Sequence, residues 1–203
     1  VGGMFSRFLS QAGLDDTVEQ LRLVSTFNFP EVATLNVPDL VSDPRDSDAH
    51  TEEVAKLLPG LVHEDQSALI LFTSWRQLNG VIRLLPDSLS QLLLVQGDDA
   101  KQVLISRHRE NVLKGKSSFL VGLASFAEGL DLPGNLCRHV IIAKIPFAVP
   151  DDPIDQTVAE FLESQGRNPF YEMSLPDAAL KLVQACGRLI RNEHDYGKIT
   201  LLD

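Results

Sequence analysis

Cysteine, histidine clusters and long apolar runs are scarce in this sequence, and each scarcity excludes a class of protein. The only two cysteines, Cys137 and Cys186, lack metal-ligand spacing, which argues against a disulfide-stabilised secreted domain and favours a reduced, cytoplasmic setting. No apolar stretch approaches the roughly 18 residues of a membrane-spanning helix, so we expect no membrane partner. The five histidines are scattered without ligand spacing, which predicts no metal site.

Positive charge is also in deficit. The 18 Lys and Arg residues are outnumbered by 28 Asp and Glu residues, which gives a formal net charge of −10. Such a surface cannot bind nucleic acid non-specifically all over, because phosphate contacts need local Lys and Arg. A narrow basic track is compatible with this charge, since basic residues cluster between Arg107 and Lys116 and recur at Arg188 and Arg191.

Short apolar runs alternate with helical patterns along most of the chain. This alternation predicts an α/β fold with a mostly parallel sheet and helices on both faces, formed by residues 1–203 as one domain, with residues 1–30 as a helical lead-in. The absence of an initiator Met before Val1 and the strand-like end suggest a piece of a longer protein. Strands are predicted at 33–37, 68–72, 91–95, 118–122, 140–143 and 199–202, and helices at 5–12, 17–23, 51–58, 75–85, 101–112, 157–163 and 175–192.

The last predicted helix carries an ordered polar stripe. Gln184, Arg188 and Arg191 are spaced i, i+4, i+7, which places them within about 60° of one another on a helix. The stripe is either the solvent-exposed face of an amphipathic helix or a row of hydrogen-bond donors that face a phosphate chain.

Other polar residues follow the predicted strands, where ligands of parallel sheets gather. Thr73 and Ser74 follow one strand, and Ser74 with Gln77 predicts a capping box whose helix N-terminus can also bind phosphate. The loop 125–134 follows another strand, with Glu128 and Asp131 on either side of Gly129. We expect these two carboxylates to accept hydrogen bonds from ribose hydroxyls, backbone N–H groups or nearby arginines.

The segment 114–117, Lys-Gly-Lys-Ser, invites comparison with a phosphate-binding P-loop. The comparison fails, because the first glycine of that motif is replaced by Glu110 and a strand rather than a helix follows. We interpret the two lysines as a solvated turn or a phosphate-backbone contact.

Taken in order, these segments resemble a known family. The chain from about residue 25 to 203 looks like the second RecA-like motor domain of the DinG branch of the XPD-like superfamily 2 DNA helicases. Each motif alone is weak, whereas the ordered set is specific. The segments that carry the resemblance are 69–74, 94–97, 125–134, 140–153, 168–170, 184–191 and the closing strand.

The resemblance implies roles for individual residues. Motif IV, at 72–74, and the segment ending at Gly97 imply DNA contacts, and the start of motif V implies further phosphate contacts. The acidic part of motif V and motif VI imply contacts with nucleotide, with Gln184 near the γ-phosphate and Arg188 and Arg191 as arginine fingers. Many relatives carry Trp where Ala127 stands. The expected DNA-binding residues are Thr73, Ser74, Gln96, Gly97, Ser125 and Phe126; the expected ATP-binding residues are Glu128, Gly129, Asp131, Gln184, Arg188 and Arg191.

For the whole protein, the resemblance implies an ATP-dependent 5′→3′ DNA helicase of the bacterial cytoplasm and nucleoid that acts in DNA repair and replication. Its expected partners are single-stranded DNA, forked duplexes and the first RecA-like domain, which would share ATP and Mg²⁺ with this chain. The P-loop, the Asp-Glu-Ala-His box and the four cysteines of a 4Fe–4S cluster are missing here, and in the family they lie before this domain. We therefore expect the chain alone to be inactive.

Two alternatives belong to other classes. A catalytically silent RecA-like module, used for nucleic-acid binding or scaffolding, predicts decay of the arginines and of Glu128 and Asp131, all of which are present. An unrelated α/β nucleotide-dependent enzyme predicts a complete phosphate-binding loop within the chain, and the sequence has none.

Overall fold

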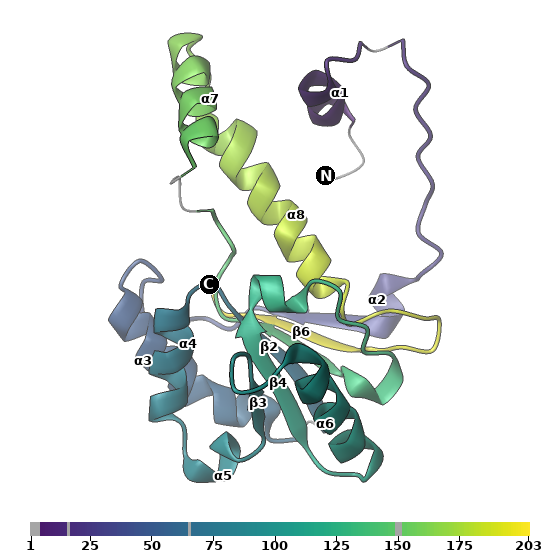
Figure 1. Cartoon of the computed structure of the whole chain (residues 1–203), viewed down its shortest axis with the longest axis vertical. Coiled ribbons are helices and arrows are strands. Elements are labelled where there is room, and N and C mark those ends of the chain that lie inside the picture. Colours follow the sequence, from purple (N-terminus) through teal and green to yellow (C-terminus); the bar gives the residue numbers. More distant parts are fainter. Residues whose placement is uncertain (1–4, 16, 65, 149–151) are drawn as a thin grey trace. The chain divides into compact units, whose positions relative to one another are not determined.

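Six parallel strands form a single sheet in the computed structural model, which describes residues 5–15, 17–64, 66–148 and 152–203 (Figure 1). Every pair of neighbouring strands is parallel, as expected for strands joined by helical crossovers. The predicted α/β class with a parallel sheet is confirmed. The strands, in their order across the sheet, are β1 (Ala33–Asn36), β6 (Gly197–Leu201), β5 (His139–Ile142), β2 (Ser67–Phe72), β4 (Ser118–Leu123) and β3 (Leu93–Val95).

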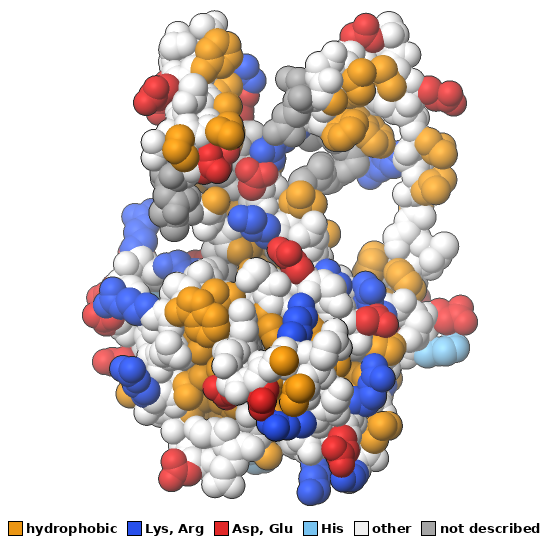
Figure 2. Space-filling view, viewed as in Figure 1, with side chains coloured by type: hydrophobic (Ala, Val, Ile, Leu, Met, Phe, Trp, Pro, Cys, Tyr) orange, Lys and Arg blue, Asp and Glu red, His pale blue; other side chains and the backbone are white. Residues whose placement is uncertain are grey.

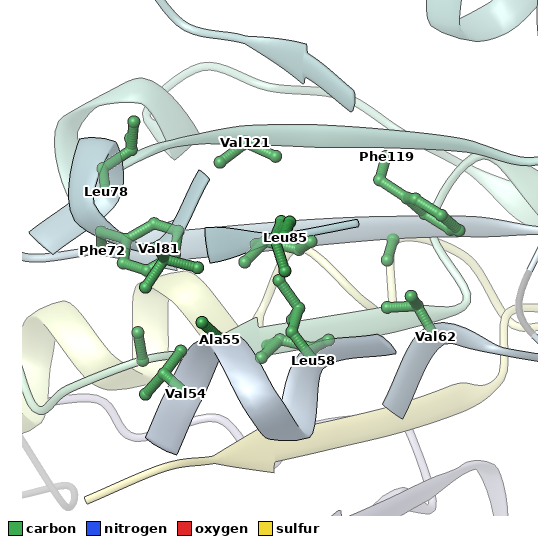
Figure 3. Close-up of a cluster of buried hydrophobic side chains, with 14 of the residues drawn as sticks. Val54, Ala55, Leu58, Val62, Phe72, Leu78, Val81, Leu85, Phe119 and Val121 are labelled. Atoms are coloured by element: carbon green, nitrogen blue, oxygen red, sulfur yellow. The ribbon is translucent and has the colours of Figure 1, made fainter. Parts of the chain in front are cut away.

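One face of the sheet is covered by α3 (Ser47–Val62), α4 (Trp75–Leu84) and the short α5 (Asp87–Ser90). Alternate residues of the strands point to this side, so that Ile70, Phe72 and Val121 pack against Leu58 and Val81 (Figure 3). All six residues of β2 are buried, which explains why its sequence is a continuous apolar run.

The opposite face is covered by α6 (Lys101–Leu113), which contacts β3 and β4. Its inner side buries Leu104, Val112 and His108. The His108 ring donates from Nε2 to the Leu136 carbonyl at 2.8 Å and accepts at Nδ1 from the Ser118 hydroxyl at 3.0 Å. Burial lowers the pKa of His108 and outweighs the smaller raising effect of the Leu136 carbonyl, so the ring is held neutral at the helix–sheet interface.

The chain divides into two compact units. The sheet belongs to the unit formed by Phe29–Pro146 and Lys181–Asp203, which also holds the short α2 (Phe29–Val32). The other unit comprises Val1–Asn28 and Phe147–Leu180. Its helices are α1 (Ser6–Ala12), α7 (Pro153–Ser164), the π-helical turn η3 (Phe170–Ser174) and the first half of α8 (Leu175–Cys186).

Within that second unit, ion pairs and ring contacts join the elements. Arg7 of α1 pairs with Asp177 of α8 at 2.8 Å, and the Phe147 and Phe170 rings lie 5.6 Å apart. Asp152 caps α7 by accepting from the Ile154 N–H, with Pro153 in the first turn, so α7 begins four residues before the predicted start at Thr157. In the described part of the chain, no helix combines the length and apolar character that a membrane crossing needs.

Two further helix predictions are wrong. Residues 17–23 are not helical, and Leu21 and Leu23 are 75% and 80% exposed, so nothing buries the apolar face that would stabilise a short helix. Helix α3 does not stop at Pro59 but continues to Val62, whose side chain is buried with that of Leu58 in the core. Core packing of this last turn offsets the hydrogen bond that Pro59 cannot donate.

The predicted polar stripe on the last helix is also wrong. Helix α8 ends at Cys186, five residues before Arg191, so Gln184, Arg188 and Arg191 do not form one helical row. The chain tightens directly after the helix, where Arg188 N–H bonds to the Ala185 carbonyl at 3.1 Å and Leu189 N–H to the Cys186 carbonyl at 3.0 Å. These three-residue turns replace the α-helical pattern and turn the chain towards β6.

Candidate functional site

Thr73 and Ser74 lie directly beyond β2, at the start of α4. The Ser74 side chain is the N-cap and accepts from the Gln77 N–H at 3.2 Å, which confirms the Ser74 half of the predicted capping box. The reciprocal bond from the Gln77 side chain to Ser74 is not found among the described residues. The Gln77 side chain turns inward and donates to Nδ1 of the buried His50 at 2.8 Å, while His50 Nε2 donates to the Leu202 carbonyl at 2.8 Å. The start of α4 is therefore tied to α3 and to the end of the chain.

Gln96 and Gly97 lie beyond β3. The Gln96 side-chain oxygen accepts from the Leu123 N–H at 2.8 Å, which links the turn after β3 to the end of β4. Gly97 is exposed, and a Cβ built there would lie 3.7 Å from the ring of Trp75, which is itself 44% exposed. The chain segments that follow β2 and β3 thus meet at one edge of the sheet.

The loop after β4 begins with a 3-10 turn, η1 (Ala124–Ala127). Ser125 is exposed, whereas the Phe126 ring is only 4% exposed and packs over Gly122, where an added Cβ would lie 2.7 Å from it. Lys101 stands 5.4 Å above the same ring and donates to the Glu128 carbonyl. Lys101 and Gly122 therefore fix the first half of this loop.

The second half of the loop meets the segment after α8. Arg191 Nε donates to Asp131 Oδ1 at 3.0 Å, and Arg188 Nη1 donates to the Leu130 carbonyl at 3.0 Å. The expected pairing of the loop with the arginines is thus found for Asp131. Glu128 is exposed, and among the described residues its carboxylate pairs with no arginine.

One donor of the Arg188 guanidinium group, Nε, is unpaired among the described residues. This nitrogen is also inaccessible to solvent. A buried donor without an acceptor costs about 1–3 kcal/mol, and the cost is larger for charged groups. Gln184 lies on the exposed side of the last turn of α8, in the same stretch of chain but outside this set of contacts.

Asp195 completes the arrangement, and sequence reasoning missed it. Its side chain is 2% exposed, and its two oxygens accept from three backbone N–H groups: Gly134 at 2.8 Å, Arg191 at 2.7 Å and Asn192 at 2.9 Å. Residues 192–197, Asn-Glu-His-Asp-Tyr-Gly, form a mostly polar stretch with the Asn, Asp and Gly typical of turns, and no spacing marks this carboxylate as buried. Burial, and to a lesser degree the Asp195 charge, raises the pKa of the Cys137 thiol to about 12, which makes it unreactive.

Charge on the visible face of the molecule is mixed rather than segregated. Figure 2 shows Lys and Arg side chains interspersed with Asp and Glu side chains, without a broad basic field. A polyanion on this face would meet local groups, such as hydroxyls, backbone N–H groups and single basic side chains. Over the described ranges, no three His, Cys, Asp or Glu side chains come together as metal ligands.

Comparison with known proteins agrees with this architecture. The helicase C-terminal domain family matches residues 60–203, and the chain belongs to that family. Over 98% of its length the chain is 41% identical to the ATP-dependent DNA helicase DinG of Photobacterium profundum and 37% identical to that of Escherichia coli. The chain spans only 29% and 28% of these two relatives.

Solved structures with the same fold include XPD proteins. One XPD helicase structure superposes with a TM-score of 0.65 at 20% identity, over 84% of this chain and 31% of the other. Xpd4 of S. tokodaii superposes with a TM-score of 0.61 at 16% identity, over 85% and 34% of the two chains. The sheet is therefore that of a RecA-like helicase domain, as the resemblance implied.

Proposed function

We propose that this chain is the second motor domain of an ATP-dependent 5′→3′ DNA helicase that acts in DNA repair and replication. In this proposal the chain supplies arginine fingers and part of a single-stranded DNA track. The observation that carries the proposal is the pairing of the 125–134 loop with Arg188 and Arg191 at 3.0 Å in both cases, beyond the carboxyl end of β4. This edge is where parallel sheets bind their ligands.

The chemistry of phosphoryl transfer explains why two arginines would stand there. The departing γ-phosphate spreads negative charge over its oxygens, and a correctly placed arginine contributes about 10³–10⁵ in rate. The Arg191 side chain is 38% exposed, and within the described part of the chain its ion pair is with the exposed Asp131, so its other guanidinium donors can reach a phosphate. Arg188 Nε is unpaired among the described residues but buried, so in this proposal domain closure must uncover it before it can bind a phosphate. Supplying them from a second domain makes hydrolysis conditional on domain closure.

The DNA track is proposed along the ends of three adjacent strands. Thr73 and Ser74 follow β2, Gln96 and Gly97 follow β3, and Ser125 follows β4, and these strands are neighbours in the order β2-β4-β3. Hydroxyls and backbone N–H groups can bind DNA phosphates without a basic surface, which suits a net charge of −10. Phe126 as a whole is 4% exposed, so in this proposal it supports the track by packing, and the predicted direct contact of Phe126 with DNA is not part of the proposal.

ATP and Mg²⁺ would be shared with a first RecA-like domain, because this sequence has no phosphate-binding loop of its own.

The 4Fe–4S cluster implied by the family does not fit this chain. Such a cluster takes four thiolates, whereas the sequence has two cysteines, of which Cys137 is buried and Cys186 partly buried. Neither cysteine is given a role in holding it.

Measurements on the purified chain alone test whether it needs the first RecA-like domain to bind and hydrolyse ATP. We expect it neither to bind ATP tightly nor to release phosphate from ATP, with or without single-stranded DNA, because the groups that cradle the β- and γ-phosphates are missing. Phosphate release is measured with the chain and with its Arg191→Ala variant. A DNA-stimulated signal that Arg191→Ala abolishes would overturn the proposal that this domain provides only half of the ATP site.

A further inference from the structure

Asp195 is a buried carboxylate that has no cationic partner among the described residues. Its side chain is 2% exposed, and its hydrogen bonds come from the backbone N–H groups of Gly134, Arg191 and Asn192. A buried charge is strongly disfavoured unless hydrogen bonds replace its lost hydration. Three charge-assisted bonds of 2.7–2.9 Å meet that need and make Asp195 a rigid attachment point.

The three N–H groups belong to two separate loops. Gly134 ends the 125–134 loop, whereas Arg191 and Asn192 belong to the turn that precedes β6. Asp195 Oδ1 holds the first loop and Oδ2 holds the second. The two loops are joined at two further points, by Arg188 with the Leu130 carbonyl and by Arg191 with Asp131. Of the three links, only the one through Asp195 is made by a buried side chain.

We propose that Asp195 is the positioning residue that sets Arg191 for ATP hydrolysis, an inference that rests on the function proposed above. Asp195 acts through the backbone: it fixes the N–H groups of Arg191 and of the following residue, and so fixes the point from which the Arg191 side chain projects. It also fixes that point relative to Gly134, and hence relative to the loop that carries Asp131. A displacement of about 1 Å at such a group can cost on the order of 10²-fold in rate.

The isosteric substitution Asp195→Asn removes hydrogen bonds to the loops while it keeps the side-chain packing. An amide has one acceptor oxygen, so its NH₂ group must face either the Gly134 N–H or the two N–H groups of Arg191 and Asn192. A donor then faces a donor, and one of the two loops is released while the side-chain volume is kept. Asp195→Ala removes all three bonds and leaves a cavity, and it serves only as a comparison for folding.

The test uses the full-length parent protein and a double-mutant cycle with Arg191→Ala. We expect Asp195→Asn to lower kcat for DNA-stimulated ATP hydrolysis by on the order of tenfold or more, with KM for ATP changed by less than about threefold. In the Arg191→Ala background the same change should cause no further loss of kcat, because a positioning residue has nothing left to position. Glu110→Gln, at an exposed carboxylate paired with Lys114, is the matched control and should keep wild-type kcat.

The outcomes separate the inference from the proposed function. Wild-type kcat in Arg191→Ala overturns the proposed function. Loss of kcat in Arg191→Ala together with wild-type kcat in Asp195→Asn overturns only the inference about Asp195. Losses that multiply in the double variant also overturn it, since Asp195 would then act independently of Arg191.

Hydrogen exchange of the same full-length variant measures directly whether Asp195 holds the backbone of the two loops in place. We expect the amides of Arg191, Asn192 or Gly134 to exchange about tenfold faster or more in Asp195→Asn, while those of β5 keep their protection. Unchanged protection at all three amides would overturn the inference, whatever the activity.

Discussion

Arg191 Nε and Asp131 Oδ1 lie 3.0 Å apart, although the two residues are separated by 60 positions in the sequence. The pair joins the loop after β4 to the turn before β6. Both side chains face solvent, with 38% of Arg191 and 69% of Asp131 exposed, so the pair is screened by water and salt. We therefore expect the pair to orient the Arg191 guanidinium rather than to hold the fold together.

A first prediction follows from that exposure. Asp131→Asn should change the free energy of unfolding of this chain by no more than about 1 kcal/mol, the range of exposed ion pairs. In the full-length parent the same variant should lower the rate of DNA-stimulated ATP hydrolysis, because the Arg191 guanidinium loses the carboxylate that orients it. Denaturant unfolding and phosphate release measure the two effects. A large loss of stability with unchanged hydrolysis would show that the pair is structural instead.

A second prediction concerns close packing of the backbone at the start of β6. A Cβ built on Gly197 would lie 2.2 Å from the Arg138 carbonyl oxygen, and the Lys198 N–H bonds to that same oxygen at 3.0 Å. Gly197→Ala should therefore cost about 1–3 kcal/mol or more, since backbone rather than a mobile side chain must move.

Gly60→Ala is the matched control for that substitution. Gly60 lies inside α3, and a Cβ there meets nothing within 4 Å, so alanine should stabilise the chain by about 0.5–1 kcal/mol. Denaturant midpoints of the two variants should move in opposite directions. Equal midpoints would contradict the close approach at Gly197.

A third prediction concerns pH. The Glu53 carboxylate accepts from the Ser42 hydroxyl and from the N–H groups of Val41 and Ser42, and these bonds lower its pKa from 4.5 to about 2. Because the folded-state pKa lies below the unfolded one, Glu53 contributes stability above about pH 4.5 and loses it progressively as the pH falls towards about 2. Unfolding free energies across this window should fall less steeply in Glu53→Gln than in the wild type. The exposed neighbour Glu52, changed to Gln, is the control, and identical slopes in all three proteins would contradict the assignment.

Much of the fold could be predicted from the sequence. The buried run at Leu69–Phe72 has no polar alternation, which is typical of a strand covered on both faces, and it is the central β2. The residues after the strands were also placed at the correct edge of the sheet, because strand direction follows from the helical crossovers. The contact between Asp131 and Arg191 is one of the three kinds of pairing that were predicted for the loop carboxylates on that ground.

Two features of the site could not be predicted. Helical periodicity continues through Arg191, yet α8 ends at Cys186, directly before Gly187, a residue type common just after helix ends, and the following Leu189 and Ile190 are buried outside the helix. Asp195 looked like any polar turn residue, since a buried carboxylate is identified by the N–H groups around it and these come from residues up to 61 positions away. Local pattern and propensity carry no information about such contacts.

The central claim is that Arg188 and Arg191 act on ATP while Thr73 and Ser74 act on DNA, and paired measurements on the full-length parent test it most directly. We expect Arg188→Ala and Arg191→Ala each to reduce DNA-stimulated ATP hydrolysis by about 10³-fold or more, with the affinity for single-stranded DNA retained. Thr73→Val with Ser74→Ala should do the reverse, weakening DNA binding and lowering its salt dependence. Equal loss of DNA affinity in the arginine variants would contradict the account and place these residues on the DNA track.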